Sequence, residues 1–158
     1  MKNSILSAIE IYKIQKEKKK YENILAASIE SLKIVQNYRG WISDDLVCAI
    51  AKVLCISPSE LDEVATFYSQ IYRKPVARNV IRYCDSVVCY IMGCKNIKST
   101  LENILKIKIG QMTNDKKFTL LPISCLGNCD KAPVLMINHH TYNNVKVNYI
   151  PILLEKYR

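Results

Sequence analysis

The sequence predicts an α/β (α+β) protein in which an N-terminal helical bundle, residues 1–75, precedes an α/β domain, residues 76–158. Two observations support this division. The first half carries apolar residues at helical spacing, between signals that start and stop helices. The second half alternates short β-branched segments with helical segments, and cysteine-rich loops follow two of the expected strands.

Two apolar stripes predict the first two helices. The first stripe consists of Ile5, Ile9 and Tyr12. The second stripe consists of Leu25, Ile29, Leu32 and Val35. Gly40 is expected to end the second helix, because glycine readily adopts the backbone conformation found at helix C-termini.

Serine-led start signals predict the next two helices. Ser43 precedes two aspartates, which suit the positive end of a helix. The segment from Ser57 to Glu60 forms an S-x-x-E capping box with proline at the first helical position. Within this region Cys48 and Cys55 are interpreted as small buried apolar residues. The aromatic residues that follow are expected to pack the helical arm onto the second domain, with a partner interface as the alternative; they are Phe67, Tyr68 and Tyr72.

The second half contains three expected strands, NVIRYC, KFTLLPIS and VLMIN, and two expected helices, NIKSTLENILKI and YIPILLEKY. One cysteine group follows the first strand and another follows the second. Open α/β sheets bind ligands beyond the carboxyl ends of their strands. We therefore expect the cysteines to form the functional site.

Composition and charge narrow the classes of function. The formal net charge is +9, but the basic residues are mostly scattered lysines with one short cluster at residues 16–20. No aromatic residues interleave with them, so we expect no nucleic-acid partner and attribute the lysines to a biased genome. We identify no signal peptide and no apolar run long enough to span a membrane. These features favour a reducing cytosolic setting without direct membrane insertion.

Four cysteines form two closely spaced pairs. Cys84 and Cys89 make a C-x4-C motif, and Cys125 and Cys129 make a C-x3-C motif. A reducing setting disfavours disulfides, and neither pair has the C-x-x-C spacing of thiol–disulfide exchange proteins. Spacing alone leaves zinc and an iron–sulfur cluster equally open. Cys94 is a fifth candidate, although it lies beyond Gly93, where the next helix is expected to begin.

Features around these cysteines favour the iron–sulfur cluster. Gly127 permits unusual backbone angles that turn N–H groups toward the sulfurs. A [2Fe–2S] core with four thiolates carries a charge of −2 when oxidised and −3 when reduced, so it needs hydrogen-bond donors and nearby cations. Three basic residues adjoin the loops: Arg82, Lys95 and Lys131. The two histidines, at positions 139 and 140, are expected to be an exposed pair in a turn rather than ligands.

The sequence resembles the family of thioredoxin-like [2Fe–2S] subunits of proton-pumping NADH:quinone oxidoreductase, respiratory complex I. The stretches that carry the resemblance are AASIESLKIVQNYRGWIS, EVATFYSQIYRKPV, VIRYCDSVVCYIMGC and FTLLPISCLGNCDKAPVLMIN. The resemblance implies a thioredoxin-like fold for residues 76–158. It also implies a ligand set without Cys94, consisting of Cys84, Cys89, Cys125 and Cys129.

The resemblance further implies one-electron exchange with FMN held by a flavin-binding subunit, while this chain itself binds neither NADH nor quinone. The large iron–sulfur subunit is a second implied partner, on the cytoplasmic side of the bacterial inner membrane. Cys55 and Asn143 stand where the family commonly has glycine, so both are expected in the left-handed conformation. The alternatives are a zinc-stabilised assembly module, a soluble ferredoxin-type carrier, and the equivalent subunit of an NAD-linked hydrogenase or formate dehydrogenase.

Overall fold

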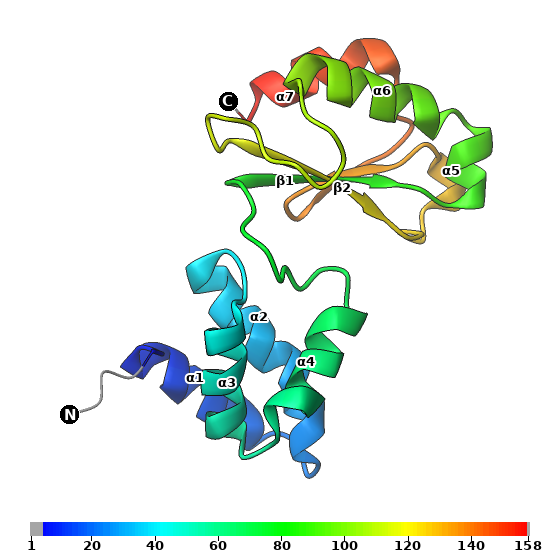
Figure 1. Ribbon diagram of the computed structural model, residues 1–158. Helices are drawn as coiled ribbons and strands as arrows, with labels where there is room; N and C mark the ends of the chain where they lie inside the picture. Colours follow the sequence, from blue (N-terminus) through cyan, green and yellow to red (C-terminus); the bar gives the residue numbers. More distant parts are fainter. Residues whose placement is uncertain (1–4, 158) are drawn as a thin grey trace. The chain divides into compact units, whose positions relative to one another are not determined.

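The computed structural model describes residues 5–157 and shows two compact units, which divide between Pro75 and Val76. The first unit is helical and the second combines helices with one sheet (Figure 1). Each unit has its own hydrophobic core. The expectation of a mixed α/β protein is therefore confirmed.

The helical unit contains α1 (Ala8–Lys18), α2 (Ser28–Arg39), α3 (Asp44–Leu54) and α4 (Pro58–Phe67), with the 3-10 helix η1 (Ile24–Ala27) before α2. The expected start signals are confirmed. Ser43 accepts a hydrogen bond from the Leu46 N–H, and Ser57 and Glu60 form the reciprocal bonds of a capping box. Within residues 5–157 no helix has both the length and the apolar character needed to cross a bilayer.

Neither Cys48 nor Cys55 belongs to the buried face of α3. The buried positions recur at helical spacing; they are Leu46, Val47, Ile50, Ala51 and Leu54. Cys48 lies on the opposite face, and Cys55 follows the last turn, so both thiols are exposed. The interpretation of these two cysteines as buried apolar residues is wrong. The expected left-handed conformation of Cys55 is confirmed by its φ of 63°.

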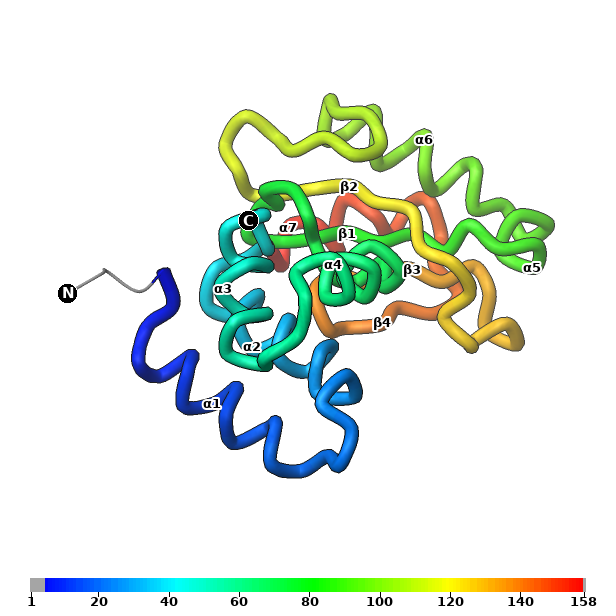
Figure 2. Tube along the Cα trace, turned by 60° about the horizontal axis from the view of Figure 1, so that its bottom comes forward, coloured from blue at the N-terminus to red at the C-terminus, as the bar shows by residue number. Residues whose placement is uncertain are grey.

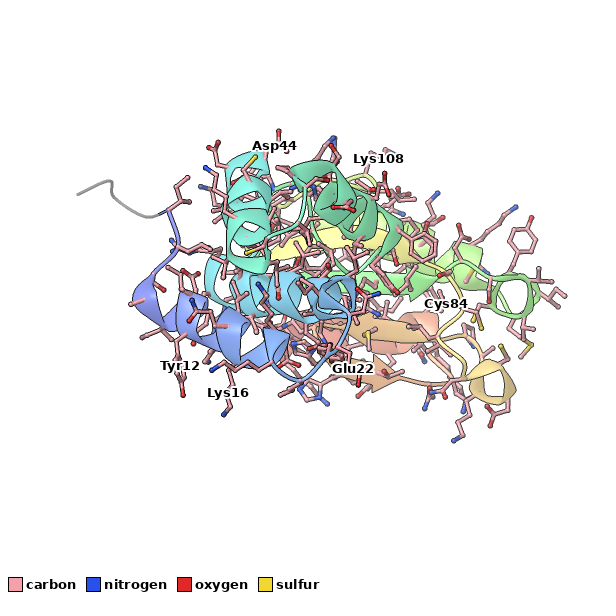
Figure 3. The ribbon with its side chains drawn as sticks, turned by 90° about the horizontal axis from the view of Figure 1, so that it is seen from below. Tyr12, Lys16, Glu22, Asp44, Cys84 and Lys108 are labelled. Atoms are coloured by element: carbon pink, nitrogen blue, oxygen red, sulfur yellow. The ribbon has the colours of Figure 1, made fainter. Side chains whose placement is uncertain are left out.

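Helix α1 buries a different face from the one that the sequence predicts. The stripe of Ile5, Ile9 and Tyr12 is exposed, and Figure 3 shows Tyr12 projecting away from the helix. The buried face instead carries Leu6, Glu10 and Ile14. The spacing of the apolar residues is compatible with burial of either face of α1. Because the buried face includes Glu10, the ion pair of this carboxylate helps to determine which face is buried.

That ion pair joins α1 to α2. Arg39 donates from Nε to Glu10 Oε1 at 2.9 Å and from Nη2 to Oε2 at 2.8 Å. The Ser7 N–H donates to the same carboxylate at 2.7 Å, as part of the capping box of α1. The hydrogen bonds from Arg39 lower the pKa of Glu10 to about 2, although burial opposes this shift.

Exposed aromatic residues lie at the end of α4. Phe67 is 81% exposed and contacts Tyr68 edge-on, with 5.1 Å between the ring centroids. Tyr68 is exposed as well. Packing of these aromatic residues between the helical arm and the second domain stays a prediction.

The second unit is a four-stranded sheet covered on one face by helices. Its strands are β1 (Asn79–Cys84), β2 (Phe118–Ile123), β3 (Leu135–Ile137) and β4 (His140–Tyr142), in the order β2-β1-β3-β4. β1 runs parallel to β2 and antiparallel to β3, and β3 forms a hairpin with β4. β4 was not among the expected strands.

Two helices cover this sheet. Helices α6 (Cys94–Leu105) and α7 (Ile150–Glu155) lie side by side on one face (Figure 1). The core between helices and sheet includes Ile81, Leu101, Leu120 and Leu153. A short helix, α5 (Val87–Ile91), follows β1 at the end of the sheet and was not predicted. It lies within the first cysteine loop.

The buried carboxylate of Glu10 gives the helical unit an acid-sensitive stability. Because its folded pKa of about 2 is below the ordinary value of 4.5, its contribution is present above about pH 4.5 and is lost as the pH falls toward 2. We expect Glu10→Gln to lower the free energy of unfolding by about 2 kcal/mol at pH 7 and by much less near pH 2. Urea denaturation monitored by circular dichroism measures both values. Glu60→Gln is the matched control, since Glu60 occupies the same capping-box position but is exposed. An equal loss for both variants at pH 7 would contradict the assignment.

The left-handed conformation of Cys55 predicts that Cys55→Gly stabilises the protein. Glycine removes a strain of about 1 kcal/mol at this position. The control is Cys48→Gly, another exposed cysteine but inside α3, which we expect to destabilise by roughly 0.3–0.5 kcal/mol because glycine disfavours helix interiors. Thermal and urea unfolding in the presence of a reductant report both changes. Destabilisation by Cys55→Gly would rule out the proposed strain.

Candidate metal centre

Parallel pairing of β1 and β2 brings the two cysteine loops together. Cys84, the last residue of β1, lies in register with Ile123, the last residue of β2. The chain leaves both strands at the same end of the sheet, where Figure 2 shows α5 and the loop after β2. Figure 3 shows Cys84 at this end. The fold thus gathers residues that lie far apart in the sequence.

The first loop forms a buried pair of thiols. Helix α5 turns the chain back so that Cys89 lies beside Cys84, and each is only 1% exposed. Interaction between the two thiols lowers the pKa of Cys84 and raises that of Cys89. Both pack in a small cluster with Cys94, Ala132 and Val134. Cys94 is the first residue of α6, as the position of Gly93 predicts.

The second loop forms an exposed pair of thiols. The Sγ atoms of Cys125 and Cys129 are 3.3 Å apart, and Cys129 begins the 3-10 helix η2 (Cys129–Lys131). Gly127 lies between them with a φ of 81°, and its N–H donates to Cys125 Sγ at 3.4 Å. The expectation that this glycine turns a backbone N–H toward a sulfur is confirmed.

The pKa values follow the same pairing. In the exposed pair, the Gly127 N–H and the contact with Cys129 lower the pKa of Cys125, while the hydrogen bond to Cys125 raises that of Cys129. In the buried pair, burial raises the pKa of Cys89 to about 11. Burial acts on Cys84 too, but hydrogen bonds from Ser86 and its neighbours outweigh it and leave the pKa below that of an ordinary thiol. In each pair one thiol has a lowered pKa and its neighbour a raised one; the lowered members are Cys84 and Cys125.

Ser86 contacts the buried pair and is not evident from the sequence. Its Oγ lies 3.2 Å from Cys84 Sγ, and this hydrogen bond helps to lower the pKa of Cys84. A serine two residues after a cysteine has no distinctive pattern, so only the folded geometry reveals this contact.

Backbone N–H groups supply most of the other donors. Besides Gly127, the N–H groups of Ser86 and Leu126 reach Cys84, and that of Val134 reaches Cys89. Of the expected cations, Arg82 is buried and donates to the Asn138 carbonyl in the β3–β4 turn. Lys95 lies over the Tyr90 ring, 4.5 Å from its centroid. Lys131, the third expected cation, is exposed and lies two residues after Cys129 in η2.

The remaining sequence expectations concern residues beyond the second loop. His139 lies in the turn before β4, and His140 begins β4; both are exposed, as expected. Asn143 is not left-handed, so that expectation is wrong; the left-handed residue is Asn144, with a φ of 49°. The Asn143 side chain instead accepts a hydrogen bond at 3.0 Å from Asn128, inside the second cysteine loop. Its amide thereby helps to hold that loop.

The arrangement in pairs is compatible with one kind of metal centre in particular. Among residues 5–157 no three His, Cys, Asp or Glu side chains are grouped as ligands of a single ion. A [2Fe–2S] cluster uses four cysteine thiolates, two on each of its irons. Two close thiol pairs with N–H donors directed at their sulfurs provide that ligand set. The residues present therefore fit a two-iron cluster.

Comparisons with known proteins identify the family. The family model "Thioredoxin-like [2Fe-2S] ferredoxin" matches residues 14–158. The E subunit of NADH-quinone oxidoreductase from Buchnera aphidicola subsp. Acyrthosiphon pisum is 60% identical, over 94% of this chain and 92% of that protein. The corresponding E subunit of Escherichia coli K12 is 56% identical, over 97% of this chain and 92% of that protein.

A solved structure adds a second kind of relative. The NAD+-reducing [NiFe]-hydrogenase in its H2-reduced state superposes with a TM-score of 0.68 at 25% identity, over 85% of this chain. The chain spans 22% of that hydrogenase chain. This chain therefore belongs to the thioredoxin-like [2Fe–2S] ferredoxin family, whose cofactor is a [2Fe–2S] cluster, and within it to the E subunits of NADH-quinone oxidoreductase, which are oxidoreductase subunits of complex I.

Proposed function

We propose that this chain exchanges single electrons between its [2Fe–2S] cluster and FMN in the flavin-binding subunit of NADH-quinone oxidoreductase. The observation that carries the proposal is the pairing of thiols at the adjoining ends of β1 and β2. The proposed ligands are Cys84, Cys89, Cys125 and Cys129. The relatives from Buchnera aphidicola and Escherichia coli support the assignment to this enzyme.

The four ligands take different positions in the site. Cys84 and Cys89 would hold the cluster from inside the small core, whereas Cys125 and Cys129 would hold it from the exposed loop. Cys94 is not a ligand in this proposal, because the two pairs already supply two thiolates for each iron. It remains a packing residue beside the buried pair.

When bound, the cluster supplies reversible one-electron chemistry, and the chain's own residues hold and tune it. The N–H groups of Ser86, Gly127 and Val134 are directed at ligand sulfurs and offset their negative charge. Burial of Cys84 and Cys89 excludes water from one side of the site. The exposed loop leaves the other side open for electron exchange.

An exposed apolar surface beside the cysteines supports contact with the flavin-binding subunit. We define the α5 surface as Val87, Tyr90, Ile91 and Met92, all of them exposed, with Ile91 exposed by 76%. These residues surround the buried Cys89, so a partner seated there lies next to the ligands. We further propose contact with the large iron–sulfur subunit and a peripheral position on the cytoplasmic side of the bacterial inner membrane.

One alternative function rests on a specific observation. The superposition on the NAD+-reducing hydrogenase favours an equivalent role in an NAD-linked hydrogenase. The same cysteines and the same one-electron exchange apply to both roles. Purification of the chain with its natural partners separates them, because a nickel-containing subunit accompanies the chain only in the hydrogenase.

The colour and spectrum of the pure chain test the cofactor ligation. We expect anaerobically purified protein to be brown, to hold two irons and two sulfides per chain, and to give an EPR signal after one-electron reduction. Metal analysis and EPR provide these values. A colourless protein with one zinc per chain would establish the zinc-stabilised module in its place.

Cysteine variants test which thiols are ligands. We expect Cys125→Ser to weaken retention of the cluster by about tenfold or more, since a hydroxyl replaces a soft thiolate. Cys94→Ala is the control and is expected to retain the wild-type iron content. Iron content after gel filtration and the EPR line shape report both effects. Equal loss in the two variants would contradict the ligand assignment.

The α5 surface generates a docking prediction. We expect Ile91→Asp to weaken association with the flavin-binding subunit by about tenfold or more, because a charge replaces an apolar contact. The control is Ile152→Asp, which alters an isoleucine on α7 that is 58% exposed. Co-purification and biolayer interferometry with the flavin-binding subunit measure association, and the visible spectrum shows whether the cluster is intact. Wild-type affinity in Ile91→Asp would exclude this surface.

A further inference from the structure

Among the residues that the structure describes, Ser86 is the one serine at the N-cap of an α-helix whose hydroxyl does not cap that helix. Ser7, Ser43 and Ser57 each accept a hydrogen bond from an N–H of the first turn. Ser86 has the extended backbone of an N-cap, with φ −95° and ψ 165°, yet its side chain makes no such bond. Its hydroxyl points to sulfur instead.

The hydroxyl contacts the first cysteine loop. The Oγ of Ser86 lies 3.2 Å from Cys84 Sγ, a member of the buried pair. Since a thiolate has no hydrogen to donate, the serine O–H is the donor whenever this sulfur is ionised. Ser86 is therefore placed to donate to a proposed ligand of the cluster.

We propose that Ser86 is a positioning residue that raises the reduction potential of the cluster by donating its hydroxyl to the sulfur of Cys84. This inference rests on the proposed function. The reduced form carries one more negative charge than the oxidised form, and a hydrogen bond to a more negative sulfur is stronger. The hydroxyl thus stabilises the reduced form more than the oxidised form.

The proposal is tested by redox titration of the purified full-length chain, followed by EPR and visible absorption. We expect Ser86→Ala to bind the cluster with wild-type iron content and to shift the oxidised-to-reduced ratio at a fixed potential about tenfold toward the oxidised form, which is about 59 mV in midpoint potential. Ser86→Thr retains the hydroxyl and is expected to restore a potential near that of the wild type. Ser124→Ala is the matched control, because Ser124 is exposed and directly precedes Cys125.

If Ser86→Ala does not bind the cluster, a second pair of variants with nearly equal side-chain shape tests the same proposal. Ser86→Thr and Ser86→Val have nearly the same shape and differ in the hydroxyl alone, so the potential of Ser86→Val is expected to lie below that of Ser86→Thr. Equal potentials in this pair, or the same shift in Ser124→Ala, would overturn the role of Ser86 while leaving the ligands as proposed. Absence of a [2Fe–2S] cluster from the wild-type chain would overturn the proposed function, and this inference with it.

Discussion

The parallel pairing of β1 with β2 is the constraint on which the metal centre depends. The two cysteine motifs are separated by residues 90–124, and nothing in their spacing brings them together. The register that pairs Cys84 with Ile123 makes both strands end at one level. Helix α6 lies between the strands in sequence and packs on both of them in space, so the crossover that permits parallel pairing also fixes where the two loops meet.

The two thiol pairs differ in their exposure to solvent, so the site has a buried side and an exposed side. Cys84 and Cys89 lie inside a small core that also contains Ala132 and Val134, so their positions are fixed by packing. Cys125 and Cys129 are exposed and are held by backbone geometry, chiefly the left-handed Gly127. A cluster bound by both pairs, as we propose, would be anchored on one side and accessible on the other. The proposed electron exchange needs both properties, because the ligands must stay fixed while a partner approaches.

Signals between neighbouring residues predict most of the helices and strands. Contacts between residues that are distant in the sequence determine which face of each helix is buried. The capping boxes and the strand ending at Cys84 follow from neighbours in sequence, and the structure has them. The buried face of α1 depends on Arg39, which lies 29 positions from Glu10, and no periodicity within one helix reveals such a partner. For the same reason the sequence pattern places Cys48 in the core, although α3 turns it outward. Strand β4 is three residues long and depends on its hairpin partner for its conformation.

The metal centre shows the same division between local and long-range information. Each cysteine pair and the role of Gly127 are evident within a few residues, but the choice between zinc and iron–sulfur stays open on spacing alone. Folding resolves the thiols into two pairs, and it places the Ser86 hydroxyl against Cys84 in one of them. Serine at an N-cap position ordinarily caps its helix, as it does three times in the other unit. Ser86 departs from that rule beside a thiol, and this departure is the structural reason for assigning its hydroxyl to the site in our proposal.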